Sequence, residues 1–140
     1  MNDRFFLDTN IFVYSFDAGA PAKARRAAEL IERAVATGKG VVSYQVAQEF
    51  FNVALRRFAK PMTVPEAEQY LTTVFRPLMA VQSSQALHMD ALRLVGRYRL
   101  SWYDALIVAA ALEGDSAFLL SEEFQHGQRF DDLQVRNPFL

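Results

Sequence analysis

The sequence predicts an α/β fold with a central, mostly parallel sheet of about four to five strands and helices on both faces. Short apolar segments, each the length of a buried strand, alternate with longer segments whose apolar residues have helical spacing. Strands separated by helices require crossover connections, which produce a parallel sheet covered on both sides. A length of 140 residues, of which 51% are hydrophobic, suits one core. We therefore expect residues 1–140 to form a single three-layer domain.

The N-terminal third is expected to supply two strands and two helices. Phe5–Leu7 is a short apolar run typical of a buried strand, and residues 11–14 continue it as a short helix or turn capped by Asn10. Pro21 begins a helix toward Gly38, with apolar residues at helical spacing and charged residues between them. Gly40–Ser43 is the second expected strand.

The middle of the chain is expected to be mainly helical. Residues 45–58 have the pattern of a helix that ends before Lys60-Pro61, since the residue preceding a proline disfavours the helical conformation. Another helix begins at residues 64–66 and should stop near Arg76-Pro77 for the same reason. Residues 79–81 are then expected to form a short strand.

The C-terminal third repeats this alternation. Residues 84–97 and 101–113 have helical patterns, and the second of these is largely apolar. Residues 117–120 are expected to form a strand, and residues 134–136 the last one.

Carboxylates stand beside apolar segments at four widely spaced places. Asp8 follows the first strand, Glu49 interrupts an apolar helix, Asp104 precedes one, and Glu122 and Glu123 follow the strand at 117–120. Ligands of parallel sheets bind beyond the carboxyl ends of the strands, so we expect these acids to gather at that edge. Clustered carboxylates repel one another unless a cation joins them, and Mg²⁺ or Mn²⁺ prefers such oxygen ligands. The pattern therefore indicates metal-assisted chemistry on a phosphate ester.

Each acid also has a purely structural interpretation. Asp8 can cap the following turn, and Ser101 with Asp104 resembles a capping box. Glu122 and Glu123 can be an exposed loop pair. Glu49 is harder to explain in this way, because its neighbours at helical spacing place it on or beside the apolar stripe.

Four segments, taken in order, resemble the motifs of PIN-domain ribonucleases, most closely those of VapC-type toxins of toxin–antitoxin modules. The matching segments are Phe6-Leu7-Asp8-Thr9-Asn10-Ile11, Gln48-Glu49-Phe50-Phe51-Asn52-Val53, Ser101-Trp102-Tyr103-Asp104-Ala105-Leu106-Ile107 and Leu119-Leu120-Ser121-Glu122-Glu123-Phe124-Gln125-His126-Gly127, with Asn137-Pro138-Phe139 as the usual ending. The resemblance implies a three-layer PIN-like fold across nearly the whole chain.

The fourth motif departs from the family pattern. Where the family carries Asp two residues after Ser or Thr, this chain has Glu123 after Ser121. The additional methylene moves the carboxylate outward by about one C–C bond, which matters in a tight metal site. Glu122 therefore remains an alternative to Glu123 as the fourth acid.

The resemblance implies a Mg²⁺- or Mn²⁺-dependent endoribonuclease that hydrolyses phosphodiester bonds with a metal-activated water. Asp8 and Asp104 are the expected metal ligands, and Glu49 and Glu123 complete the catalytic set of acids. Asn10 and Ser121 are expected to orient carboxylates or water, although Asn10 can equally act as a helix cap. Two alternatives remain. One is a catalytically degenerate PIN-like module that still binds RNA or a partner, and the other is a phosphotransfer enzyme with an aspartyl nucleophile, although such families usually carry a second acid at the position of Asn10.

Composition is compatible with this assignment. The net charge is −1, so RNA contacts must come from local patches or from the metal, and the absence of cysteine excludes disulfides and Cys-ligated zinc. We expect a cytoplasmic protein without a membrane segment, a cognate antitoxin as partner, and a homodimer or toxin–antitoxin hetero-oligomer. Trp102 and Tyr103, which precede Asp104, are candidates for stacking on an unpaired base, although core packing is expected for at least one of them.

Overall fold

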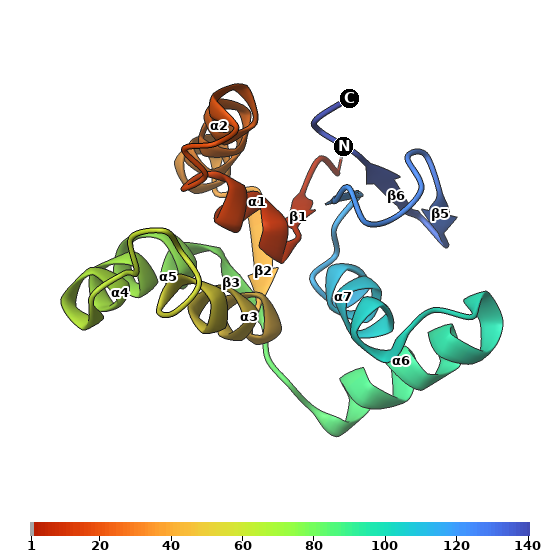
Figure 1. Ribbon diagram of the computed structural model, residues 1–140. Coiled ribbons are helices and arrows are strands. Elements are labelled where there is room, and N and C mark those ends of the chain that lie inside the picture. The colour runs from red at the N-terminus through yellow and green to blue at the C-terminus, as the bar shows by residue number, and fades with distance from the viewer. Residues whose placement is uncertain (1) are drawn as a thin grey trace.

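A computed structural model describes residues 2–140 and contains a six-stranded sheet between two layers of helices (Figure 1). The strands are β1 (Phe5–Leu7), β2 (Gly40–Ser43), β3 (Met79–Val81), β4 (Phe118–Leu120), β5 (Arg129–Phe130) and β6 (Leu133–Arg136). The helices are α1 (Thr9–Tyr14), α2 (Pro21–Thr37), α3 (Tyr44–Ala54), α4 (Val64–Tyr70), the π-helical turn η1 (Leu71–Phe75), α5 (Arg76–Leu78), α6 (Gln85–Tyr98) and α7 (Trp102–Glu113). The predicted α/β class and the mostly parallel sheet are confirmed.

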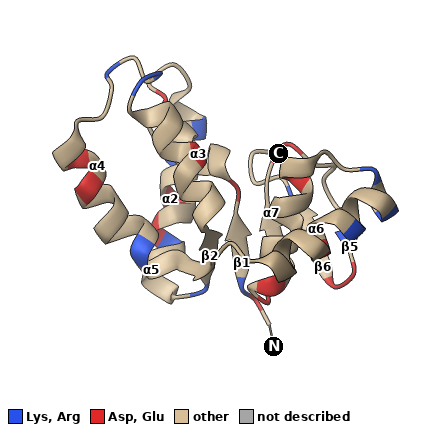
Figure 2. Ribbon diagram, turned by 90° about the horizontal axis from the view of Figure 1, so that it is seen from below, with Lys and Arg blue, Asp and Glu red and all other residues tan. Residues whose placement is uncertain are grey.

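The strand order is β3-β2-β1-β4-β6-β5, and every neighbouring pair is parallel except β5 with β6. Figures 1 and 2 both show α2 to α5 on one side of the central strands and α6 and α7 on the other. β1 lies at the centre of the sheet between β2 and β4, so the residues that follow β1 and β4 emerge side by side at one edge. The topology thereby places Asp8 next to Ser121.

The core is built from the apolar faces that the sequence predicts. Phe6 and Leu7 of β1 and Leu119 of β4 are fully buried, and α7 is buried over most of its length because it packs against the sheet on one side and α6 on the other. The same core continues to Phe50, whose ring stacks on Tyr70 with centroids 5.0 Å apart. None of the helices within residues 2–140 is long and apolar enough to cross a bilayer.

The structure differs from the local expectations in three places. The helix expected over 45–58 is wrong in its end: it ends at Ala54, where Met62 donates from its backbone to the Ala54 carbonyl and the chain turns. The helix from residue 64 ends at Leu78, near Arg76-Pro77 as expected, but it continues through the proline: the π-helical turn η1 lets the backbone N–H of Arg76 reach the Leu71 carbonyl, and Pro77 occupies the first turn of α5, where its missing N–H is tolerated.

The third difference concerns the start of α1. Asn10 is the second residue of α1 and does not cap it. Asp8 is the cap, because its Oδ1 accepts a 2.8 Å hydrogen bond from the backbone N–H of Thr9. β5, a two-residue antiparallel strand at the sheet edge, was also not expected from the sequence.

Candidate functional site

Asp8 lies at the carboxyl end of β1 and is only 5% exposed. Its Oδ1 accepts from the Thr9 backbone, and its Oδ2 accepts a 2.7 Å hydrogen bond from the hydroxyl of Ser121, the residue that follows β4. Both oxygens of a buried carboxylate therefore have donors, as such a group requires. The Asp8 side chain can therefore cap α1 and face the edge of the sheet at the same time.

The pKa of Asp8 is raised to about 6, chiefly by burial. The hydrogen bonds from Ser121 and Thr9 oppose this rise, whereas the negative charges of Glu123 and Glu49 add to it. The repulsion shows that these carboxylates share one electrostatic environment, although they come from three separate parts of the chain.

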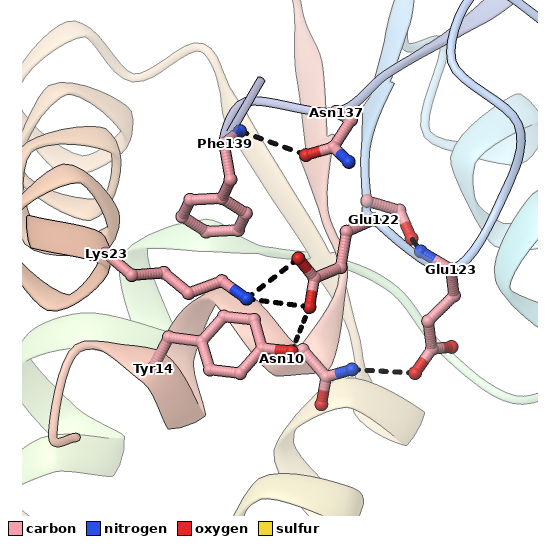
Figure 3. A network of polar contacts seen from close by, with 8 residues as sticks. Asn10, Tyr14, Lys23, Glu122, Glu123, Asn137 and Phe139 are labelled. Carbon is pink, nitrogen blue, oxygen red and sulfur yellow. Dashed lines mark hydrogen bonds and ion pairs between the residues drawn. The ribbon is translucent and has the colours of Figure 1, made fainter. Parts of the chain in front are cut away.

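Glu123 points away from its neighbour Glu122 and toward α1 (Figure 3). Its Oε1 accepts a 2.6 Å hydrogen bond from the side-chain amide of Asn10, and its backbone N–H donates to the Ser121 hydroxyl over 3.1 Å. Desolvation raises the pKa of Glu123, and the charges of Asp104 and Glu49 raise it further. Glu123 is thus coupled to the other three acids.

Glu122 lies in a different network (Figure 3). Its carboxylate accepts a hydrogen bond from the Tyr14 hydroxyl and forms a 2.9 Å ion pair with Lys23 of α2. The Lys23 ammonium lies 3.9 Å from the centre of the Tyr14 ring and 5.1 Å from that of Phe139. The hydrogen bond from Tyr14 is the main reason that the pKa of Glu122 is lowered, so its charge is satisfied within the fold.

Glu49 and Asp104 reach the site from two helices. Glu49 is exposed on α3 rather than partly buried in the apolar stripe, and its Oε1 accepts from the Thr9 hydroxyl at 3.1 Å and the Gln45 amide at 3.2 Å. Asp104 lies in the first turn of α7, where its backbone N–H donates to the capping hydroxyl of Ser101 over 3.3 Å. The N-terminus of that helix favours the negative charge.

The structure therefore brings Asp8, Glu49, Asp104 and Glu123 to one edge of the sheet and turns Glu122 away from them. No group of three or more acidic or histidine side chains within residues 2–140 is already arranged to hold a metal ion. Asp8, Glu49 and Glu123 are instead each tied to neutral donors. Burial first, and then the neighbouring negative charges, raise the pKa of Asp8 and Glu123, and hard oxygen donors of this kind fit a divalent cation.

Two donors to this cluster were not identified from the sequence. Thr9 is buried beside Asp8 and connects α1 to Glu49, and Gln45 lies one helical turn before Glu49. The four-residue spacing of Gln45 and Glu49 is a signal that could have identified the pair. Trp102 and Tyr103 are 36% and 65% exposed, so the expectation that at least one packs in the core is wrong.

Comparisons with known proteins agree with this architecture. VapC20 of Mycobacterium tuberculosis, described as a sarcin–ricin loop cleaving toxin, superimposes with a TM-score of 0.59 at 19% identity, covering 82% of this chain and 86% of that one. VapBC2 of Rickettsia felis, bound to a DNA fragment from its promoter, superimposes with a TM-score of 0.62 at 16% identity, covering 95% of this chain and 97% of the other. At these identities the similarity establishes the fold. None of the curated proteins matches the sequence significantly.

The sequence model of the PIN domain matches residues 5–126, a span that contains all four acids and both residues expected to orient them. The parallel pairing of β1 with β4 places Asp8 and Ser121, from the first and fourth of the motifs recognised in the sequence, side by side at one edge of the sheet. The chain belongs to the PIN domain family.

Proposed function

We propose that residues 1–140 form a single nuclease domain, a Mg²⁺- or Mn²⁺-dependent endoribonuclease that hydrolyses RNA phosphodiester bonds. The observation that carries the proposal is the electrostatic coupling of Asp8 to Glu123 and Glu49, and of Glu123 to Asp104. A buried carboxylate beside other negative charges destabilises the folded state when it is ionised, so stability does not explain its presence. Groups with such raised pKa values are concentrated at functional sites.

Asp8 and Asp104 are the proposed metal ligands, with Glu49 and Glu123 completing the acidic pocket. A divalent cation held there would supply an activated water at neutral pH and neutralise charge on the phosphate. The protein's own part is orientation: Ser121 and Thr9 fix the two oxygens of Asp8, and Asn10 fixes Glu123. In the proposed reaction the water oxygen bonds to phosphorus and the 3′-oxygen leaves as a hydroxyl, so the products are a 5′-phosphate and a 3′-hydroxyl, as the family resemblance implies.

The biological role proposed is that of a toxin with a cognate antitoxin. It is supported by membership of the PIN domain family and by the similarity in fold to VapC20 and VapBC2. VapC20 is described as a sarcin–ricin loop cleaving toxin, and that description supports a toxin that acts by cleavage here. VapBC2 supports assembly with an antitoxin into a hetero-oligomer, and a homodimer of this chain is part of the same proposal.

The enzymatic proposal is tested by incubating RNA with the protein in Mg²⁺, in Mn²⁺ and in EDTA. Cleavage should require either cation and should produce 5′-phosphorylated fragments. Cleavage that continues in EDTA, or fragments with a cyclic or 3′-phosphate end, would show that the metal-activated water is the wrong mechanism.

The partner proposal is tested by size-exclusion chromatography with light scattering, alone and with the product of the adjacent gene. A dimer or a stable complex with that product supports it. A monomer that does not bind the product of the adjacent gene contradicts the partner proposal.

A degenerate PIN-like module is the second candidate, because Glu123 replaces the Asp of the family pattern. Such a protein would bind RNA or its partner without cleaving. Glu123 nevertheless remains hydrogen-bonded to Asn10 and coupled to the other acids, which favours the active enzyme.

A further inference from the structure

A cavity of about 250 Å³ lies beside the acidic pocket. Its walls come from the first turns of α3, from the segment between β3 and α6, and from the first turn of α7. Figure 1 shows the segment from β3 to α6 passing between α3 and α7. The cavity thus lies where three elements meet at the edge of the sheet that carries the acids.

Gln45 connects this cavity to the acids. Its side-chain amide donates to Oε1 of Glu49 at 3.2 Å and to the backbone carbonyl of Tyr103 at 3.4 Å. Gln45 and Tyr103 both line the cavity, and Asp104 is the next residue along α7. A ligand in the cavity would therefore lie immediately beside Glu49 and Asp104.

Aromatic rings are exposed around the cavity. Tyr44, Trp102 and Tyr103 are 44%, 36% and 65% exposed, and all three line it. The ring of His88, which also lines the cavity, has its centroid 5.6 Å from that of Trp102. Exposed aromatic faces beside a cavity are the surfaces on which unpaired bases stack.

The remaining polar groups suit the edge of a base better than a phosphate. Ser43 is only 3% exposed, lines the cavity, and has a buried hydroxyl without a hydrogen-bond partner in residues 2–140. A buried hydroxyl without a hydrogen-bond partner destabilises the fold, so a ligand that forms a hydrogen bond with Ser43 would remove this cost. Gln48 and Gln82 add primary amides, which both donate and accept. Among residues 2–140, no lysine, arginine or carboxylate lines the cavity.

We propose that this cavity binds one unpaired nucleobase of the RNA substrate, next to the phosphate that is cleaved. The base stacks on the Trp102–Tyr103 side, and Ser43, Gln48 and Gln82 hydrogen-bond to its edge. The cavity would thereby select single-stranded or loop RNA and favour some bases over others at that position. This inference rests on the proposal that RNA is the substrate.

Trp102 is the only tryptophan in the chain, so its fluorescence reports on the cavity. The experiment titrates the protein with four short ribo-oligonucleotides, each of one base, and with an abasic oligonucleotide of equal length, all in EDTA. The phosphates are common to all five, so any repulsion from the acids affects them equally. Base-bearing oligonucleotides should quench Trp102, and the abasic one should bind at least about tenfold more weakly.

Variants then test which groups read the base. Gln82→Ala, Gln48→Ala and Ser43→Ala should change the ratios of affinity among the four bases by about three- to tenfold, and Tyr103→Ala should weaken binding of all four. Gln69→Ala, an exposed glutamine on α4 outside the cavity, should change nothing. Gln82 is exposed between β3 and α6, so its variant tests the proposal even if Ser43→Ala does not fold.

Equal affinity for abasic and base-bearing oligonucleotides would overturn the proposal, as would unchanged base ratios in both glutamine variants. The readout does not depend on catalysis. Base-dependent quenching by a protein that fails to cleave RNA in Mg²⁺ or Mn²⁺ would support the cavity and reject the nuclease. RNA cleavage without base-dependent binding would support the nuclease and reject the base-binding cavity.

Discussion

The hydroxyl of Ser121 donates a 2.7 Å hydrogen bond to Oδ2 of Asp8 and accepts the backbone N–H of Glu123 over 3.1 Å. One side chain at the end of β4 therefore orients the acid at the end of β1 and also fixes the backbone of the fourth motif. This relationship depends on β1 and β4 being parallel neighbours, paired from Phe5 with Phe118 to Leu7 with Leu120. The acidic pocket is accordingly a product of the sheet topology.

The metal-free protein should lose stability as the pH rises through the titration of Asp8. Its folded pKa of about 6 lies above the ordinary value of 3.8, so the folded state holds the proton more tightly than the unfolded state. The free energy of unfolding should fall by at most about 3 kcal/mol between about pH 4 and pH 6. Above pH 6 it should stay at the lower value.

The matched variant is Asp8→Asn, which cannot titrate. Chemical denaturation in EDTA should show it to be more stable than the wild type at pH 8 and without that advantage at pH 4. An equal difference between the two proteins at both pH values would contradict the raised pKa.

Divalent cations should raise the melting temperature of the folded protein. Carboxylates that repel one another gain a shared counter-ion, and a ligand that binds only the folded state stabilises it by mass action. Thermal scans in EDTA, Mg²⁺, Mn²⁺ and Ca²⁺ measure this effect, with Asp8→Asn as the variant in which the shift should shrink. No shift with any of the three cations at millimolar concentration would argue against a shared acidic pocket.

Glu123 should be the fourth acid of the site. Glu123→Gln should lower the cleavage rate or change the preference between Mg²⁺ and Mn²⁺, whereas Glu123→Asp should retain activity because it restores the family residue. Cleavage rates measured against metal concentration decide between them. If Glu122→Gln alters the metal dependence and Glu123→Gln does not, Glu122 is the fourth acid and the assignment is wrong by one residue. If neither variant alters it, only three carboxylates take part in the reaction.

Glu122 should instead contribute to folding. The Glu122 carboxylate makes a hydrogen bond with Tyr14 and a partly exposed ion pair with Lys23. Together these two interactions contribute about 1 kcal/mol to the free energy of unfolding. Glu122→Gln keeps an acceptor for Tyr14 but loses the ion pair, and Tyr14→Phe loses the hydrogen bond but keeps the ion pair, so each variant should lower the free energy of unfolding by part of that amount. Unchanged stability in both variants would mean that the network is not energetically coupled to the fold.

Much of the candidate site follows from local patterns combined with one topological rule. Asp8 follows an apolar strand and Asp104 begins an apolar helix, and the convergence of parallel strands at one edge is enough to bring them together. The predictions for Asp8 and Asp104 depend only on residue type and spacing. β4 ends at Leu120 and residues 122–124 form bends, so the opposite directions of Glu122 and Glu123 follow from their separate partners and not from a continuing strand.

Other features depend on tertiary contacts that spacing does not encode. The partners of Glu122 come from α1 and α2, and β5 exists only because Arg129 and Phe130 pair with β6. Pro77 normally predicts a helix end, but the preceding π-helical turn accommodates it. At least one of Trp102 and Tyr103 was expected in the core, whereas both are exposed and line a cavity.

The most direct test of the central claim is the rate of RNA cleavage in Mg²⁺ and in Mn²⁺ for Asp8→Asn and Asp104→Asn, each with circular dichroism to verify the fold. Asn keeps the shape and removes the charge, so metal binding should fail. Asp132→Asn, an exposed acid in the turn between β5 and β6, is the control. We predict folded proteins in all three cases, with cleavage abolished in the first two and unchanged in the third. Near-wild-type cleavage by either Asp8→Asn or Asp104→Asn would contradict the account.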